Sequence, residues 1–132
     1  MGKAAATQFV KAGGRALLVS RSADKLRRAR EEILHATGAD ASAVETAAID
    51  AADEAAVAAF AAGLAPNSYD ALVVSAAGRA PHGPVAELDV ADARGMMDSK
   101  FWTAWHCAKY VGPRLADGGS VTFVAGVLNR RP

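Results

Sequence analysis

Cysteine is nearly absent from this sequence, since Cys107 is the only one among 132 residues. A single cysteine cannot form an internal disulfide, which favours a reducing compartment, and we therefore expect a cytoplasmic protein. Cys107 lies in an apolar, aromatic stretch, so we expect a buried and unreactive thiol. The three histidines (His35, His82 and His106) show no spacing typical of a metal site, and we predict no bound metal.

Long hydrophobic runs and an excess of one charge sign are lacking as well. No apolar stretch approaches the roughly 18 residues that a membrane-spanning helix needs, and the first residues lack the apolar core of a secretory signal. Fifteen basic and 14 acidic residues give a formal net charge of +1. We therefore expect neither a membrane nor a nucleic acid as a partner. Aromatic residues make up only 6% of the chain, whereas 33 residues are alanine, so the 52% of hydrophobic residues overstates the core.

Helix-like and strand-like segments alternate along the whole sequence. The expected helices cover residues 3–12, 24–37, 53–62 and 89–115, and the expected strands cover residues 15–20, 44–49, 71–75 and 120–124. Short apolar strands separated by helices are typical of a parallel sheet that is covered on both faces. We predict the α/β class, with a Rossmann-like doubly wound parallel sheet in a single domain over residues 1–132.

Two charged residues follow directly on expected strands. Arg21 comes after the strand at 15–20, where a dinucleotide-binding fold meets the adenosine ribose and an arginine suits a 2′-phosphate. Asp50 follows the strand at 44–49, where its carboxylate can accept a hydrogen bond from the adenine amino group. A solvated turn arginine and a plain loop aspartate near a helix N-terminus are the alternative interpretations.

Four stretches, in this order, resemble the short-chain dehydrogenase/reductase family. Residues 1–5 (MGKAA) resemble the end of its TGxxxGxG turn, and Ser20-Arg21 resembles the position that selects NADP over NAD. Residues 49–54 (IDAADE) resemble its DVTDE stretch, and residues 73–78 (VVSAAG) resemble its NNAG stretch beside the cofactor. The resemblance implies that NADP is bound in preference to NAD. The implied cofactor-binding residues are Gly2, Ser20, Arg21, Ser22, Asp50, Ala51, Ser75, Ala76, Ala77 and Gly78.

The sequence departs from this family at its catalytic positions. Lys100 stands where the family has an asparagine that helps to hold a proton-relay water. Lys100 is the one candidate catalytic residue, as an acid or base, and the alternative is a lysine that extends into solvent. The family's catalytic serine position reads Val124-Ala125-Gly126-Val127, and its YxxxK pair would lie beyond Pro132. We therefore expect no turnover by this chain alone.

The family's strand order also predicts an incomplete sheet. In the order 3-2-1-4-5 the first strand lies between the second and the fourth, and this chain lacks both the first strand and the C-terminal part. The strands at 15–20 and 71–75 would then face an empty slot, where unpaired buried amides cost about 1–3 kcal/mol each. We expect these strands to close up, to be joined by another chain, or to leave a marginal domain that aggregates.

Two functional hypotheses follow. The first is an NADP(H)-binding oxidoreductase domain whose substrate would be a small carbonyl or alcohol, as the resemblance implies. The second is a non-catalytic nucleotide-binding or protein-interaction module on the same scaffold. Phe101, Trp102 and Trp105 belong either to the core or to a subunit interface, and because the corresponding helix of the family packs against a partner subunit, we expect a homo-oligomer formed through the helix at 89–115.

Overall fold

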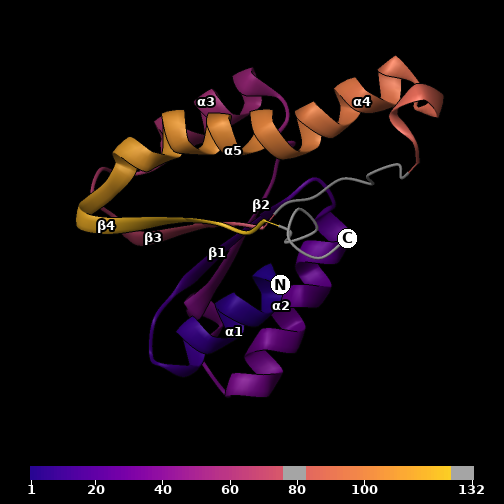
Figure 1. Ribbon diagram of the computed structural model, residues 1–132. Coiled ribbons are helices and arrows are strands. Elements are labelled where there is room, and N and C mark those ends of the chain that lie inside the picture. Colours follow the sequence, from indigo (N-terminus) through magenta and orange to yellow (C-terminus); the bar gives the residue numbers. More distant parts are fainter. Residues whose placement is uncertain (76–82, 126–132) are drawn as a thin grey trace. The chain divides into compact units, whose positions relative to one another are not determined.

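The computed structural model describes residues 1–75 and 83–125 (Figure 1). The chain divides into two compact units, Met1–Asp50 and Ala51–Pro132. Helices and parallel strand pairs alternate within each unit, which confirms the predicted α/β class. The four described strands form two parallel pairs, β1 with β2 and β3 with β4. The predicted single domain and the predicted slot in the sheet stay predictions.

The first unit has a core between two helices and one strand pair. Its elements are α1 (Gly2–Lys11), β1 (Ala16–Ser20), α2 (Ala23–Thr37), the 3-10 helix η1 (Ala41–Ala43) and β2 (Val44–Ala48). The buried core consists of Ala6 and Val10 from α1, Ile33 from α2 and Val44 from β2. Burying a valine or isoleucine side chain stabilises the fold by about 1.5–3 kcal/mol, so this small cluster holds the unit together.

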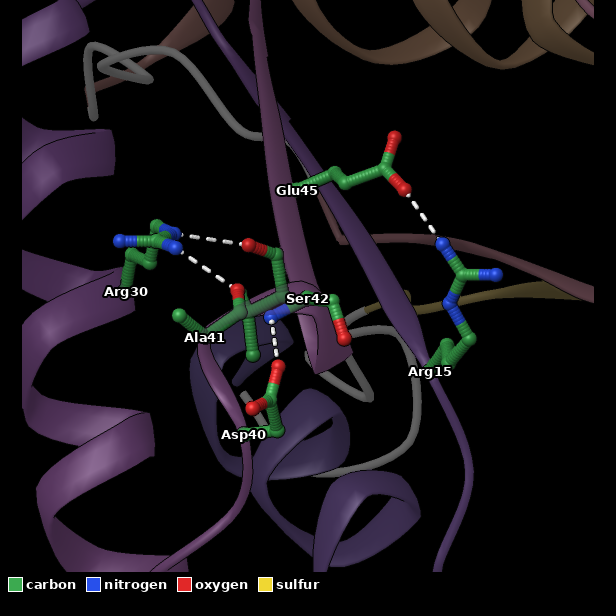
Figure 2. A network of polar contacts seen from close by, with 7 residues as sticks. Arg15, Arg30, Asp40, Ala41, Ser42 and Glu45 are labelled. Carbon is green, nitrogen blue, oxygen red and sulfur yellow. Dashed lines mark hydrogen bonds and ion pairs between the residues drawn. The ribbon is translucent and has the colours of Figure 1, made fainter.

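Arg30 on α2 fixes the beginning of β2 (Figure 2). Its Nε donates to the carbonyl oxygen of Val44 at 2.8 Å, and its Nη2 donates to that of Ala41 at 2.7 Å. The Asp40 carboxylate accepts from the backbone N–H of Ser42 at 2.8 Å in the same turn. Because one planar guanidinium satisfies two carbonyls, the direction in which β2 leaves the turn is set by α2.

The second unit has a long helical run above a strand pair. Its elements are α3 (Glu54–Gly63), β3 (Tyr69–Val74), the 3-10 helix η2 (Val85–Glu87), α4 (Val90–Met97), the π-helix η3 (Asp98–Trp102), α5 (Thr103–His106), the π-helix η4 (Cys107–Val111), the 3-10 helix η5 (Gly112–Arg114) and β4 (Leu115–Phe123). Asp89 caps this run by accepting from the N–H of Ala91 at 2.7 Å. Figure 1 shows α4 through α5 as one continuous ribbon. Residues 90–111 are named the 90–111 helix below.

The 90–111 helix differs from the predicted uniform helix in its two π-helical segments. Thr103 is buried, and both its N–H and its hydroxyl donate to the carbonyl oxygen of Asp98, the hydroxyl at 3.1 Å. The additional donor at i+5 stabilises the wider turn. Helical structure continues through η5 to Arg114, so the predicted end of this helix at about residue 115 is confirmed.

Gly118 and Gly119 lie within β4, which we had predicted to begin only at Ser120. Leu115 pairs with Tyr69 and Ser120 pairs with Ala71, so the residues between Leu115 and Ser120 bulge out of the ladder. A Cβ on Gly119 would lie 2.8 Å from the carbonyl oxygen of Ala116, which leaves room for glycine alone. The predicted strand boundary was wrong because strand pairing exists on both sides of the bulge.

Candidate functional site

Arg21 and Asp50 lie together at one edge of the β1–β2 pair. Ser20 is opposite Ala48 in the parallel register, and the N–H of Ile49 donates to the carbonyl oxygen of Ser20 at 3.1 Å. The two strands therefore end at the same edge, and the residues after them are neighbours. Arg21 Nη1 lies 3.8 Å from Asp50 Oδ2. The parallel pairing of the two strands accounts for this proximity.

The N-terminus of α2 adds a partial positive charge beside Arg21. Ser22 is the N-cap, and its Oγ accepts from the N–H of Lys25 at 3.3 Å. A helix of 15 residues favours an anion at this end, and the Arg21 side chain is 71% exposed. A guanidinium and a helix N-terminus at one strand end fit a phosphate group, so these residues suit the 2′-phosphate that the sequence predicts.

Gly2 is the first residue of α1. Met1 is the N-cap of this helix, and among the described residues no side chain caps it. The first backbone N–H groups of a helix suit a phosphate, and the role of Gly2 in cofactor binding stays a prediction. The neighbouring Lys3 ammonium pairs with Glu32 on α2, so α1 and α2 are joined near this end.

The second unit carries the other predicted residues. Ala51 is its first residue, and Ser75 follows β3 in a half-buried position. Ala76, Ala77 and Gly78 lie outside the described residues. Of the ten predicted cofactor-binding residues, the structure thus brings Arg21 and Asp50 together, with Ser20 and Ser22 adjoining Arg21 in the chain.

Lys100 lies in the π-helix η3, and its side chain is exposed. This agrees with the interpretation of Lys100 as a lysine that extends into solvent, and its role as an acid or base stays a prediction.

Directly after β4, the N–H of Val124 donates to the carbonyl oxygen of Val74 at 3.0 Å, so the pairing of β3 and β4 continues past Phe123.

A cluster of Glu54, Lys109 and Tyr110 was not predicted. Oε1 of Glu54 accepts from Tyr110 Oη at 2.6 Å and from Lys109 Nζ at 2.9 Å. The hydrogen bond from Tyr110, and then that from Lys109, lower the pKa of Glu54, and the bonds to Tyr110 and Glu54 raise the pKa of Lys109. More than 50 residues separate the partners, and no local spacing in the sequence signals such a contact. The cluster fixes the first turn of α3 against the 90–111 helix.

The aromatic residues of the 90–111 helix are exposed. Phe101, Trp102 and Trp105 are 45%, 42% and 53% exposed, and the Phe101 and Trp105 rings stack with centroids 5.9 Å apart. The prediction that they belong to the core is therefore wrong for this chain, and the subunit interface stays a prediction. Cys107 is half-buried, and burial raises the pKa of its thiol, which favours the less reactive protonated form.

Comparisons with known proteins agree with this arrangement. A family model described as enoyl-(acyl carrier protein) reductase matches residues 1–131. The chain belongs to the short-chain dehydrogenase/reductase family. The predicted family is thereby confirmed. A short-chain type dehydrogenase/reductase from Mycobacterium ulcerans is 26% identical, with a TM-score of 0.75 over 92% of this chain and 45% of that chain.

Two further solved structures support the partial Rossmann-like fold of a short-chain dehydrogenase/reductase. Serine dehydrogenase from Escherichia coli is 20% identical, with a TM-score of 0.80 over 99% of this chain and 59% of that chain. A small-chain dehydrogenase in complex with NADPH is 26% identical, with a TM-score of 0.66 over 89% of this chain and 53% of that chain. The chain thus spans about half to three-fifths of these proteins. Among curated protein sequences, none matches it significantly.

Two kinds of feature are absent from the residues that the structure describes. Among residues 1–75 and 83–125, no three side chains of the metal-ligating types are grouped as a metal site requires. Within the same residues, no helix has both the length and the apolar character to cross a membrane.

Proposed function

We propose that this chain is the NADP(H)-binding part of a short-chain dehydrogenase/reductase. The observation that carries the proposal is the pair of Arg21 and Asp50 at the carboxyl edge of β1 and β2, beside the N-terminus of α2. An exposed ion pair at 3.8 Å contributes little stability, so the Arg21 guanidinium can leave Asp50 for a more highly charged phosphate. The small-chain dehydrogenase in complex with NADPH supports the same cofactor.

Each predicted residue has a place in this proposal. Arg21, with Ser20 and Ser22 beside it, would hold the 2′-phosphate, and Asp50 would accept from the adenine amino group. The amides that begin at Gly2 would hold the pyrophosphate. The remaining contacts would come from the backbone at Ala51, Ser75, Ala76, Ala77 and Gly78, where small side chains permit a close approach. When bound, the cofactor supplies a hydride, and NAD would bind more weakly because it lacks the phosphate that Arg21 recognises.

The proposed substrate class is a small carbonyl or alcohol, and we propose that these 132 residues do not turn it over by themselves. Val124 and Ala125 follow β4 without a hydroxyl. Tyr69 and Tyr110 have no lysine four residues later. Lys100 remains the one candidate acid or base in this proposal. The proposal also includes a cytoplasmic location and a homo-oligomer formed through the helix at 89–115.

A matched pair of variants tests the cofactor assignment. Arg15 and Arg21 stand at opposite ends of β1 and are 72% and 71% exposed, so Arg21→Gln and Arg15→Gln remove the same charge from the same strand. Loss of a charge-assisted hydrogen bond predicts that Arg21→Gln weakens NADPH binding about 10- to 100-fold and leaves NADH unchanged. Arg15→Gln should change neither Kd. An equal response of both variants would contradict the role of Arg21.

The exposed aromatic residues favour a second candidate function. Phe101, Trp102 and Trp105 form an exposed apolar surface on the 90–111 helix, and such a surface is typical of protein interaction sites. A non-catalytic interaction module would self-associate or bind a partner without measurable affinity for NADPH. Trp105→Ser would then shift the sedimentation profile of the chain, while no concentration of NADPH would quench its fluorescence.

A further inference from the structure

Strand β4 has an open edge in the part of the chain that the structure describes. Its one partner among these residues is β3, which pairs with it in parallel (Figure 1). Residues 117–125 are exposed throughout, and Val121 and Phe123 are 41% and 49% exposed. A strand at the edge of a sheet turns a row of backbone N–H and C=O groups outward. The second unit therefore presents a surface on which a further strand can pair.

The register of the pair shows which residues of β4 face this open edge. The N–H of Val124 donates to the carbonyl oxygen of Val74, so the backbone groups of Val124 face β3. Because backbone groups alternate between the two sides of a strand, those of Thr122 also face β3, and those of Val121 and Phe123 face outward. The outward donors and acceptors thus belong to two residues with large, exposed apolar side chains.

The sequence of this edge does not oppose the approach of another strand. Proteins usually protect an exposed edge with charged residues, above all lysine, or with proline. Residues 120–124 (SVTFV) contain neither, and their valines, threonine and phenylalanine favour extended structure. In β2 and β3, by contrast, Glu45 and Asp70 supply such charges. Two copies of the β4 edge can therefore approach each other without repulsion between side-chain charges in this stretch.

We propose that the β4 edge pairs with the β4 edge of a second copy of this chain, antiparallel and with the symmetry axis at Thr122. In this register Val121 of each copy lies opposite Phe123 of the other, and each such pair exchanges both of its backbone hydrogen bonds. A β-branched residue opposite an aromatic one, and threonine opposite threonine, are favourable cross-strand pairs. The edge is thus complementary to itself in donors, acceptors and side chains, which favours a second copy over an unrelated strand.

This interface is separate from the one proposed on the 90–111 helix, and it does not rest on the proposed cofactor. Disulfide formation tests its register. Thr122 would face Thr122 of the other copy without mutual backbone hydrogen bonds, where Cα atoms lie about 4.5 Å apart and a disulfide can form. In a Cys107→Ser background, mild oxidation of Thr122→Cys should therefore convert most of the chain into a covalent dimer on a non-reducing gel.

The matched control for this cross-link is Val121→Cys in the same Cys107→Ser background. This position is also exposed, but it faces Phe123 of the other copy, and its own counterpart lies beyond the limit of about 7 Å between Cα atoms. Val121→Cys should therefore cross-link at least about 10-fold more slowly than Thr122→Cys. Addition of Trp105→Ser should leave this difference unchanged, because that substitution alters only the 90–111 helix.

Charged residues at Thr122 measure the association without a covalent bond. In a Trp105→Ser background, Thr122→Lys and Thr122→Glu each place like charges opposite each other, and each should weaken the dimer at least about 10-fold in sedimentation equilibrium. An equal mixture of the two variants places lysine opposite glutamate and should restore the dimer. The mixture also controls for folding, because it contains the same two chains that fail to associate separately.

The outcomes decide the proposal. Faster cross-linking of Thr122→Cys than of Val121→Cys, together with recovery of the dimer in the mixture, would support it. Equal rates at the two positions, or no covalent dimer at either, would overturn it. It would also fail if Trp105→Ser abolished the cross-link, since the β4 edges would then meet only through the helix interface. A mixture that stays monomeric would likewise exclude the antiparallel register at Thr122.

Discussion

Helix α2 buries its large apolar side chains, whereas the 90–111 helix leaves most of its own exposed. Leu26 and Ile33 of α2 are almost fully buried, and charged residues occupy its remaining surface. On the 90–111 helix, Met97, Phe101 and Trp105 recur at every fourth position and are about half exposed. Both helices have an apolar face by sequence, and only α2 covers that face within its own unit.

The comparison shows what an apolar repeat in a sequence can predict. A spacing of three or four residues indicates which side of a helix is apolar. It does not indicate whether the same chain supplies the surface that covers this side. For α2 the cover is α1 and β2 of the same unit, with Ala6, Val10 and Val44 in contact with Ile33. For the 90–111 helix we propose that the cover is a second copy of the chain.

The largest expected effect contrasts Ile33 with Trp105. Ile33→Ala leaves a cavity at a site that is 1% exposed, and it should lower the free energy of unfolding by about 3 kcal/mol. Trp105→Ala removes an exposed side chain and should cost less than about 1 kcal/mol at a concentration where the chain is monomeric. Urea denaturation measures both values. A loss at Trp105 as large as that at Ile33 would mean that the 90–111 helix is covered after all.

The next effect concerns the turn before β2. Arg30→Gln removes two charge-assisted hydrogen bonds to backbone carbonyls and should lower the free energy of unfolding by about 2 kcal/mol. Arg28→Gln is the control, because Arg28 is an exposed arginine of the same helix that makes one bond, of 3.5 Å, to the carbonyl oxygen of Asp24. Equal urea midpoints for the two variants would show that Arg30 does not organise the first unit.

Alanine substitutions at two glycines of the second unit should change the stability of the fold in opposite directions. Gly119→Ala places a methyl group 2.8 Å from a backbone oxygen and should destabilise the fold by about 1–2 kcal/mol. Gly95→Ala introduces a methyl group into open space within α4 and should stabilise it by about 0.5–1 kcal/mol. Thermal denaturation of both variants tests the bulge in β4. A tolerated Gly119→Ala would contradict the close approach described for this strand.

The smallest effect is the pH dependence that Glu54 contributes. Hydrogen bonds from Tyr110 and then Lys109 lower its pKa from the ordinary value of 4.5 in the folded state. A carboxyl with a lowered folded pKa stabilises the fold above its unfolded pKa, and this contribution is lost as the pH falls through the folded pKa. The wild type should therefore be more stable than Glu54→Gln at pH 7, and the difference should shrink toward pH 3. A constant difference across this range would exclude the charged cluster.

Glu32 allows the same measurement in the first unit. The hydrogen bond and the charge of Lys3 lower the pKa of Glu32, so Glu32→Gln should show a pH dependence of the same sign. Because both carboxylates are exposed, we expect two small and similar effects that decrease with added salt. If the pH dependence of stability had opposite signs for Glu54→Gln and Glu32→Gln, the assignment of both carboxylates to charge-assisted surface pairs would be contradicted.

Much of the fold, and the pair of Arg21 and Asp50, could be predicted from the sequence. The short apolar strands and their intervening helices made a parallel pairing the expected one, and parallel pairing brings the residues after β1 and β2 to one edge. These features depend on local patterns and a general rule of topology. They required no knowledge of a specific side-chain contact.

The contacts of His106, Lys109 and Tyr110 could not be predicted in the same way. Each joins the 90–111 helix to a residue about 55 positions earlier, and nothing in the local sequence marks such a partner. The π-helical segment η3 was missed because its wider turn depends on buried Thr103 and its additional donor to Asp98. Contacts between distant segments of the chain decide where the bonds of His106, Lys109 and Tyr110 form. The spacing of apolar residues in the sequence does not indicate such contacts.

The most direct test of the central claim is a titration of the purified chain with NADPH, with NADH as the control and nicotinamide fluorescence as the signal. We expect saturable binding that favours NADPH, because Arg21 and the N-terminus of α2 would recognise the 2′-phosphate. Absence of binding to both dinucleotides, or equal binding of both, would contradict it.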